Sequence, residues 1–353
     1  MISLLRRAAG ALRARLGARA RLSPQDRYDA RMRAEIDRYS TVENVHDLPA
    51  IFHVWSHAYV LPKMQAVFGA SSFDDFYSGY ILRYAQENPG ETVEVASLGA
   101  GNGDMEVGLG KVLRAKGFAG FHFRCLDVNP DMLARGREMA GAAELSDRFS
   151  FERVDAARWR PERPLAIVIA HQALHHFVEL EAIFANVKTA IGDRGYFLSN
   201  DMIGRNGHQR WPEALAKVHE IWRDMPDRYK YNHQLKRFEI TYQNWDCSKE
   251  GFEGIRAQDI LPLLVKTFHF DAFVAYGNIV DIFVDRGFGH NFDPHNPEDV
   301  AFIERLGALD EKLVDEGVVK PCQMIAAMRA QPVQVAQPRF YRHWSPEFCL
   351  RAP

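Results

Sequence analysis

The chain has 353 residues and a formal net charge of −2, with 47% hydrophobic and 25% charged residues. This balance is that of a globular protein with a sizeable core, and it gives no electrostatic reason to expect nucleic acid as a partner. No apolar run approaches the roughly 18 residues that span a bilayer. The four cysteines are widely scattered, which argues against a zinc knuckle or a disulfide framework.

The first 22 residues form an unusual basic segment. They include arginines at six positions and no acid, while Leu5, Ala9, Leu12 and Leu16 recur at helical spacing. This pattern fits a weak membrane-surface helix, a docking arm or a frayed, solvated terminus. No continuous apolar centre follows the first arginines, so a secretory signal is not predicted. We expect a cytoplasmic protein, with peripheral contact to the inner face of a membrane if this helix binds lipid.

A helical segment follows and then gives way to alternating strands and helices. Ser23 and Pro24 make a good helix start, and a second helix is predicted over 72–86. From residue 92 the pattern alternates, with strands over 92–98, 121–127, 149–154, 165–170 and 195–199 and with helices over 105–116, 130–140 and up to about 190. Such alternation predicts an α/β fold, a Rossmann-like doubly wound sheet that is mostly parallel.

The second half of the chain interrupts this alternation twice. A polar and aromatic stretch over 201–254 precedes a helix over 255–267 and a strand over 270–276. A mostly helical stretch over 278–317 then precedes a last strand over 321–328. We therefore divide the chain into a basic N-terminus (1–22), an N-terminal helical cap (23–90), a ligand-binding domain (91–330) with inserts at 201–254 and 278–317, and an extended C-terminal tail (331–353).

Three alternate glycines form the most informative motif. Gly99, Gly101 and Gly103 lie between an apolar strand and a helix, where glycine allows positive φ and the close approach of a ligand to the backbone. A dinucleotide-binding loop prefers the spacing G-x-G-x-x-G, with the helix aimed at a pyrophosphate. The spacing here is G-x-G-x-G, which favours a ligand without a phosphate at this point.

The strands that follow end in polar residues. Asp127 ends the second strand, where a carboxylate can accept hydrogen bonds from both ribose hydroxyls. Asp155 ends the third strand, where it can accept from an adenine amino group. The fourth strand runs into His171 and Gln172. Because the carboxyl ends of parallel strands share one edge of the sheet, we expect these residues to border one crevice.

This ordered set resembles the class I S-adenosylmethionine (SAM)-dependent methyltransferases, over about residues 92–199. The resemblance implies SAM as cofactor, with the methionine part near the glycine loop, the ribose near Asp127, the adenine near Asp155 and the sulfonium near the end of the fourth strand. The implied cofactor-binding residues are Gly99, Ala100, Gly101, Asn102, Gly103, Asp127, Val128, Asp155, Ala156, Ala170, His171 and Gln172. One position departs from the family pattern: Ser97 stands where an acid is usual. Asp104 or the N-terminal helices are the candidates for that contact.

Histidines supply the candidate catalytic groups. His175 and His176 follow the fourth strand, and His208 lies in the first insert. We name His208 and His175 as candidate general bases and His176 as a substrate-binding residue. A histidine that only bonds to the backbone at a helix start is the structural alternative for the His175–His176 pair. A metal site would require further ligands at suitable spacing, and none can be named from the sequence, so no metal is predicted.

The first insert supplies the candidate acceptor site. Asp201, Arg205, Asn206, Arg210 and Trp211 lie within a short stretch that contains two glycines, and so many polar groups cannot be buried unpaired. Further candidates in the insert and just after it are Tyr231, Asn244, Asp246 and Arg256, and for Arg256 and Asp246 a purely structural ion pair is an equal alternative. A polar pocket that closes over the cofactor edge is the interpretation that we favour.

The resulting prediction is methyl transfer from SAM to a hydroxyl or amine of a polar small molecule. A sugar or glycoconjugate is suggested by the density of tryptophan, tyrosine and polar residues in the insert. Two alternatives are an NAD(P)-type Rossmann oxidoreductase and a non-catalytic binding protein with the same fold. Neither nucleic acid nor a metal is expected, and the only other partner considered is a membrane surface at the N-terminus.

Overall fold

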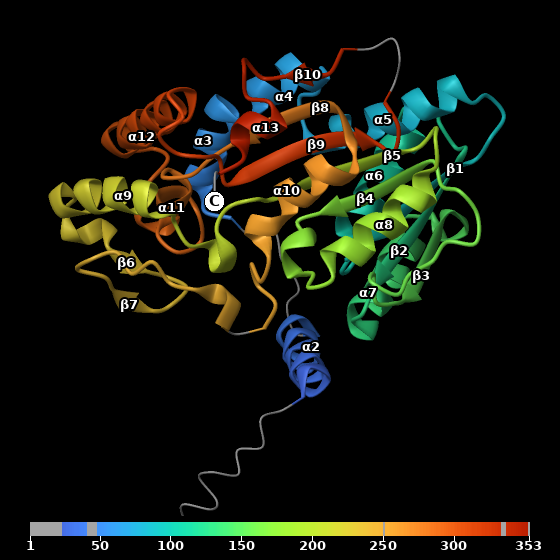
Figure 1. Cartoon of the computed structure of the whole chain (residues 1–353), viewed down its shortest axis with the longest axis horizontal. Coiled ribbons are helices and arrows are strands. Elements are labelled where there is room, and N and C mark those ends of the chain that lie inside the picture. The colour runs from blue at the N-terminus through green and yellow to red at the C-terminus, as the bar shows by residue number, and fades with distance from the viewer. Residues whose placement is uncertain (1–22, 41–47, 250, 333–336, 352–353) are drawn as a thin grey trace, which may run out of the picture.

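The computed structural model describes residues 23–40, 48–249, 251–332 and 337–351. An eight-stranded sheet forms its centre in the order β10-β8-β9-β5-β4-β1-β2-β3 (Figure 1). The strands are β1 (Val93–Leu98), β2 (Phe121–Asp127), β3 (Phe149–Arg153), β4 (Ile167–His171), β5 (Tyr196–Met202), β8 (His269–Tyr276), β9 (Gln323–Arg329) and β10 (Arg339–Phe340). The strands β1 to β5 are parallel, and β9 runs antiparallel to both β5 and β8. The predicted fold class, a mostly parallel Rossmann-like sheet, is confirmed.

Helices cover both faces of the sheet, as the alternating pattern predicts. The helices α5 (Phe73–Glu87), α6 (Asp104–Ala115) and α7 (Pro130–Ala142) contact one another in series. The helices α8 (Leu180–Ile191) and α10 (Ala257–Thr267) contact each other and lie in front of the sheet in Figure 1. Apolar residues are buried on both faces of β4 and β5, which explains their continuous hydrophobic runs.

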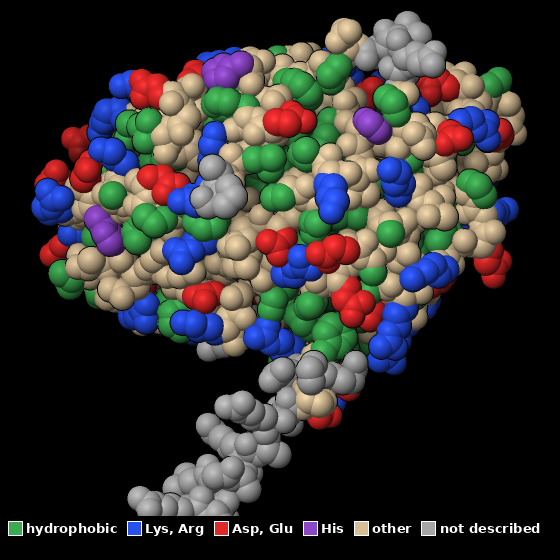
Figure 2. All heavy atoms as spheres, in the orientation of Figure 1, with side chains coloured by type: hydrophobic (Ala, Val, Ile, Leu, Met, Phe, Trp, Pro, Cys, Tyr) green, Lys and Arg blue, Asp and Glu red, His purple; other side chains and the backbone are tan. Residues whose placement is uncertain are grey.

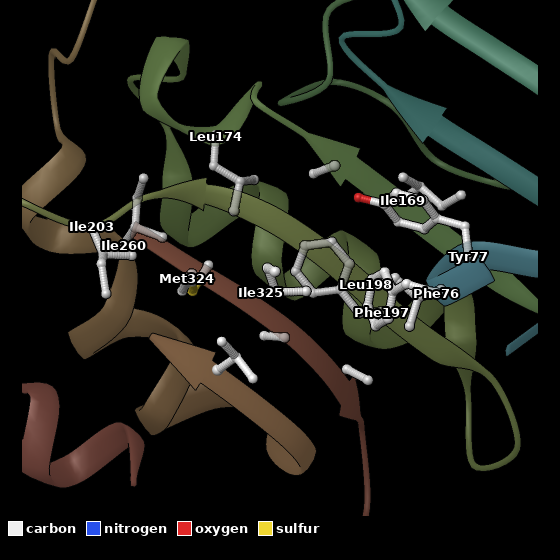
Figure 3. Close-up of a cluster of buried hydrophobic side chains, with 14 of the residues drawn as sticks. Phe76, Tyr77, Ile169, Leu174, Phe197, Leu198, Ile203, Ile260, Met324 and Ile325 are labelled. Carbon is white, nitrogen blue, oxygen red and sulfur yellow. The ribbon is translucent and has the colours of Figure 1, made fainter. Parts of the chain in front are cut away.

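The core extends across the sheet and into both helical layers. Figure 3 shows part of it, where Phe197 and Leu198 of β5 pack with Ile169 of β4 and Ile325 of β9. All four side chains have 0% exposure. Because the core is tightly packed, the strand ends are held in fixed positions. The residues that follow each strand are therefore also well positioned.

The chain order places a crevice at one edge of the sheet. The strand β1 lies between β2 and β4, so the connections on its two sides lead in opposite directions. In an open α/β sheet, ligands bind outside the carboxyl ends of the strands at such a switch point. The glycine loop follows β1 at this point.

Among the described residues, four helices precede the sheet: α2 (Pro24–Ser40), α3 (Ala50–Tyr59), α4 (Leu61–Phe68) and α5. The predicted Ser23 cap is present, since its Oγ accepts from the Asp26 N–H at 3.0 Å, and Ser72 caps α5 in the same way, accepting from the Asp75 N–H at 3.1 Å. The helix α2 lies at the lower edge of the molecule in Figure 1 and contacts α7.

The inserts contain more regular structure than the sequence indicated. The first contains α9 (Pro212–Asp224) and the short hairpin of β6 (Tyr231–Asn232) and β7 (Arg237–Phe238). The helix α9 was not predicted, because the polar residues around it hid an apolar stripe of Ala214, Val218 and Trp222. The second contains α11 (Asp281–Val284) and α12 (Pro297–Asp315), as its mostly helical pattern indicated.

The described part of the C-terminal tail is packed rather than simply extended. It contributes β10 at the sheet edge and α13 (Pro346–Cys349). Trp344 is 1% exposed, and its Nε1 donates to the Asp315 carboxylate at 2.6 Å. The buried indole, with its N–H paired, anchors the tail on α12. The prolines of this segment had predicted an extended tail instead.

Residues 1–22, on which the membrane-helix and docking-arm predictions rest, lie outside the described residues. Within the described ranges, no helix combines the length and the apolar character that a membrane span requires. On the face drawn in Figure 2, basic and acidic side chains are interspersed over the surface.

Candidate functional site

A large cavity opens at the carboxyl ends of the parallel strands. Its volume is about 1190 Å³, and residues from the ends of β1, β2, β3, β4 and β5 line it. The helices α2 and α3 and the first insert complete its walls. A volume above the usual 300–1,000 Å³ of ligand pockets is enough for two ligands side by side.

The glycine loop forms the floor of this cavity through Gly99 and Gly101, whereas Gly103, which was predicted with them, does not line it. Gly99, Gly101 and Gly103 all have positive φ, between 57° and 71°. A Cβ on Gly99 would lie 2.9 Å from the Cβ of Ala173, and one on Gly103 would lie 3.0 Å from the Phe151 ring. Glycine is therefore required both by the backbone conformation and by the close packing of this loop against the β3 and β4 ends.

Asp127 holds the glycine loop in place from the end of β2. Its carboxylate accepts from the Gly101 N–H at 2.9 Å and from the Asn129 N–H at 2.8 Å. Burial raises the pKa of Asp127, and these hydrogen bonds oppose that rise. Ala100, Asn102 and Val128 line the cavity beside it, as the sequence analysis expected for a cofactor-binding edge.

Position 97 holds a serine where an acid is usual, and the acid at this point of the cavity comes from α6 instead. Glu106 lies in the first turn of α6, is 2% exposed and lines the cavity. The Ser97 hydroxyl donates to Glu106 Oε1 at 2.5 Å, so the two side chains form one unit. Burial raises the pKa of Glu106 to about 7. Asp104 also lines the cavity, but the direct bond to Ser97 is made by Glu106, which the sequence analysis did not name.

Asp155 joins the adenine side of the cavity to α2. The Tyr28 hydroxyl of α2 donates to Asp155 Oδ2 at 3.1 Å, and the Ala157 N–H donates to Oδ1 at 3.0 Å. Met32 and Ile36 of α2 line the cavity, together with Ala156. The N-terminal helix thus contributes directly to the site, a role that its own sequence did not indicate.

The end of β4 is constrained from two sides. The Tyr77 hydroxyl lies 2.9 Å from His171 Nδ1, and the ring of Phe73 packs against the same imidazole. Gln172 follows with a φ of 51°, a left-handed conformation that is uncommon outside glycine. Strained residues of this kind cluster at functional sites. Ala170, predicted beside them, is instead packed inside the sheet and does not line the cavity.

Behind this edge, Asp201 organises the loop that follows β4. Its carboxylate accepts from the backbone N–H groups of Ala173 at 2.9 Å and Leu174 at 2.7 Å, and it lies 2.7 Å from His175 Nδ1. Asp201 is 0% exposed and does not line the cavity. It therefore positions His175 rather than contacting a substrate. Burial opposes the ionisation of both groups, but their mutual attraction lowers the pKa of Asp201 and, together with Glu253, raises the pKa of His175 to about 10.

Three histidines converge on Glu253. Its Oε1 lies 2.6 Å from His208 Nε2 and 3.4 Å from His175 Nε2, and its Oε2 lies 3.8 Å from His176 Nε2. Burial opposes the charge of Glu253, but the histidine contacts lower its pKa. Burial also lowers the pKa of His208. All four side chains line the cavity, so the structure gathers residues from three distant points of the chain.

A second polar group, made by Arg210, Asp281 and Gln323, forms another part of the cavity wall. Arg210 Nη2 lies 3.7 Å from Asp281 Oδ2. Burial raises the pKa of Asp281 to about 8, although Arg210 opposes that rise. Within the described residues, three buried atoms of this wall have no hydrogen-bond partner: Arg210 Nε, Asp281 Oδ1 and Gln323 Oε1. Since buried polar groups are normally paired, this wall is prepared for a polar ligand.

Several predicted substrate residues do not line the cavity. Arg256 is held by Glu181 at 2.7 and 2.8 Å and by Asp259 at 2.7 Å, and its role is structural. The others make contacts within the insert or with neighbouring elements. Asn206 pairs with Gln258, Asn244 with the Arg210 backbone, Asp246 with Ser248, Trp211 with Arg205 and Arg351, and Tyr231 with Phe238. Arg205 and Arg210, by contrast, do line the cavity.

The residues around the cavity fit SAM. The backbone of Gly99 and Gly101 lines the cavity, the buried acid Glu106 lies beside it, and carboxylates lie at the two next strand ends. These features correspond to the ammonium, ribose and adenine groups of that cofactor. Arg210 and Glu253 line the same cavity and are not needed for these contacts, so they are available to a second ligand.

Comparison with known proteins gives the same class. Residues 91–254 match a family model described as a methyltransferase domain. Among solved structures, a SAM-dependent methyltransferase from Thiobacillus denitrificans in complex with S-adenosyl-L-homocysteine is 14% identical, with 81% of this chain and 100% of that chain covered and a TM-score of 0.39. An O-methyltransferase from Brevibacillus brevis is 12% identical, with 72% of each chain covered and a TM-score of 0.40.

A geranyl diphosphate C-methyltransferase from Streptomyces coelicolor is 9% identical, with 85% of this chain and 98% of that chain covered and a TM-score of 0.42. No curated protein matches the chain significantly.

Proposed function

We propose that this chain is a SAM-dependent methyltransferase that methylates a hydroxyl group of a polar small molecule, a proposal supported by the match of residues 91–254 to a methyltransferase domain. SAM is the cofactor, which excludes the NAD(P)-type oxidoreductase that the glycine loop alone left open. When bound, SAM supplies a methyl group that its sulfonium has already activated, and the acceptor exchanges one proton for that group. The protein has to position the acceptor, exclude water and remove the proton.

The residues that would hold SAM follow from the cavity floor. Glu106 with Ser97 would bind the ammonium group, Asp127 the ribose hydroxyls, and Asp155 with Tyr28 the adenine edge. The backbone of Gly99 and Gly101 would lie against the methionine part. This arrangement keeps the family's expected contacts but moves the acidic one from β1 to α6.

His208 is the general base that we propose. Its Nε2 is held by Glu253 at 2.6 Å, which leaves Nδ1 of the same ring to accept a proton. His208 has a φ of 55° and lies within a tight turn that contacts Gly254. His175 is less suited, because Asp201 and Glu253 lie on its two ring nitrogens and favour its protonated form.

The acceptor class follows from the polar wall formed by Arg210, Asp281 and Gln323. The three unpaired atoms of Arg210, Asp281 and Gln323 offer one donor and two acceptors, which hydroxyl groups can satisfy together. A polyhydroxylated molecule such as a sugar fits this description. These buried, unpaired atoms are the observation that carries the proposal of a polar acceptor.

The test is a methyl-transfer assay with labelled SAM against metabolite fractions sorted by chemical class. We expect turnover in fractions rich in hydroxyl groups, and we expect His208→Asn to lower kcat by about 10²- to 10⁴-fold. Binding of S-adenosylhomocysteine should be unchanged in this variant, because His208 lies outside the cofactor floor. The exposed His295→Asn is the matched control and should keep the full rate.

Two results would count against this proposal. Full activity of His208→Asn on the true acceptor would remove the base assignment and would favour an amine acceptor, which needs no base of this kind. Acceptors confined to apolar fractions would contradict the polar wall as the binding surface.

A further inference from the structure

The structure assigns a transition-metal site to His175, His176 and Glu253 at the acceptor side of the cavity. We propose that these three side chains bind one divalent first-row ion, Zn²⁺ or Fe²⁺, and that the ion holds the acceptor oxygen. This inference rests on the proposed function for its role in methylation, but the site itself does not. It differs from the sequence analysis, which predicted no metal.

The distances between the three side chains match those of ligands around one ion. Imidazole nitrogens and carboxylate oxygens bind Zn²⁺ at about 2.0–2.2 Å, so two ligands at a tetrahedral angle lie about 3.4 Å apart. His175 Nε2 lies 3.4 Å from Glu253 Oε1, and His176 Nε2 lies 3.8 Å from Glu253 Oε2. One ligand atom from each of the three side chains lies within 4.8 Å of the others.

The surroundings supply the outer support that metal ligands have in known sites. A metal-bound histidine commonly donates its other N–H to a carboxylate, which fixes its tautomer and orientation. His175 does this, with Nδ1 2.7 Å from Asp201, and Asp201 is itself held by backbone N–H groups. Glu253 is held in turn by His208 at 2.6 Å. His175 and Glu253, which are held in this way, come from different parts of the chain and lie close together.

The donor set selects the kind of ion. Two imidazoles and one carboxylate suit zinc or non-haem iron, whereas Mg²⁺ prefers oxygen ligands alone. Three protein ligands leave one or more positions open, as in catalytic rather than structural sites. All three side chains line the cavity, so an ion held by them would be accessible from it.

In this position the ion would act as a Lewis acid on the acceptor oxygen. The acceptor oxygen would bind the ion and pass its proton to His208, and the methyl group would move from the SAM sulfur to this oxygen, leaving S-adenosylhomocysteine, so no oxidant or reductant is needed. Glu253 would then link the two parts of the site, because it binds the ion and orients the base.

The test measures metal binding on the full chain, independently of turnover. Protein stripped with a chelator is titrated with Zn²⁺, anaerobic Fe²⁺, Mn²⁺ and Mg²⁺, and the bound metal is counted by plasma mass spectrometry. Co²⁺ serves as a spectroscopic probe of the coordination. We expect one ion per chain for Zn²⁺ or Fe²⁺, and no comparable binding of Mg²⁺.

Glu253→Gln and His176→Asn should each weaken metal binding by at least about 100-fold, more than the loss typical of an outer-shell change. Both side chains are partly exposed, at 23% and 21%, which favours folding of the variants. His295→Asn is the control and should bind metal as the wild type does. S-adenosylhomocysteine affinity, measured by calorimetry, should remain unchanged in all three variants.

Equal metal binding by Glu253→Gln, or no binding of any of these ions, would overturn the site and leave a network of histidines that share protons with Glu253. Full methylation by the stripped protein would overturn the role of the ion in holding the acceptor. If S-adenosylhomocysteine also fails to bind the wild type, the proposed function fails separately, because none of the three ligands belongs to the cofactor floor.

Discussion

Glu106 supplies the acidic group that position 97, a serine, does not provide. It extends from the first turn of α6 to the serine of β1, and the two share a short hydrogen bond. Burial makes ionisation costly, so the group changes charge near neutral pH rather than near pH 4.5. The cofactor's ammonium group would favour the ionised form and thus couple cofactor binding to pH.

We therefore expect the affinity for S-adenosylhomocysteine to rise between pH 6 and pH 7.5, as Glu106, with its pKa of about 7, loses its proton. Without ligand, the folded protein holds the Glu106 proton more tightly than the unfolded chain does. The free energy of unfolding therefore falls as pH rises from 4.5 through 7. Calorimetry across this range should give a flat profile for Glu106→Gln. The exposed Glu138→Gln should keep the wild-type profile, and a pH dependence that persists in Glu106→Gln would contradict the assignment.

Asp201 illustrates a buried residue whose importance is structural. Removing one partner of a buried, hydrogen-bonded charge pair typically costs 3–5 kcal/mol. We expect Asp201→Asn to lower the free energy of unfolding by about 3 kcal/mol, measured by urea denaturation. Asp193→Asn, at an exposed position after α8, should change it by less than about 0.5 kcal/mol. Equal stability of the two variants would show that Asp201 does not hold the loop after β4.

At the scale of elements, the sequence predicted the sheet well. Apolar runs located β1 to β5 to within two or three residues, and the runs of β1, β4 and β5 are nearly continuous because these strands are buried on both faces. The carboxylates at strand ends could be predicted, since parallel strands end at one edge. Glu106 could have been suspected, because an acid in the first turn after a glycine loop lies near the same ligand.

The acceptor side could not be predicted in this way. Glu253 meets His175 and His208 only through the path of a long insert, and no periodicity in that insert encodes the path. The same pattern of polar residues also left structural pairs such as Arg256–Glu181 indistinguishable from pocket residues. Which polar groups face the cavity depends on packing across the insert, not on spacing.

The helix α2 forms part of the cavity wall without being buried itself. It reaches the site through Tyr28, Met32 and Ile36, yet none of its described side chains is fully buried. Proline inside a helix costs about 3 kcal/mol. Arg31→Pro should therefore disrupt α2 and weaken S-adenosylhomocysteine binding by about 10-fold, with little change in the melting of the main domain.

Arg31→Ala is the matched control, because it removes the same side chain and keeps the helix. Calorimetry and thermal denaturation measure the two effects separately. Unchanged affinity in Arg31→Pro would mean that α2 does not contribute to cofactor binding.

For the whole molecule, the cavity connects cofactor binding to global stability. A ligand that binds only the folded state stabilises it by about 2.7 kcal/mol at 100 times its Kd. We expect S-adenosylhomocysteine to raise Tm by several degrees and NADH at the same concentration to leave it unchanged. An equal rise with NADH would contradict the assignment of the cavity floor.

The position of α2 also has a consequence for the timing of the reaction. Tyr28 bonds to Asp155 on the cofactor side, and its ring packs against Phe252, the neighbour of Glu253, at 5.4 Å. One helix thus bridges the two halves of the cavity. Exchange of the spent cofactor would require this bridge to open, so the departure of S-adenosylhomocysteine should limit the rate of turnover.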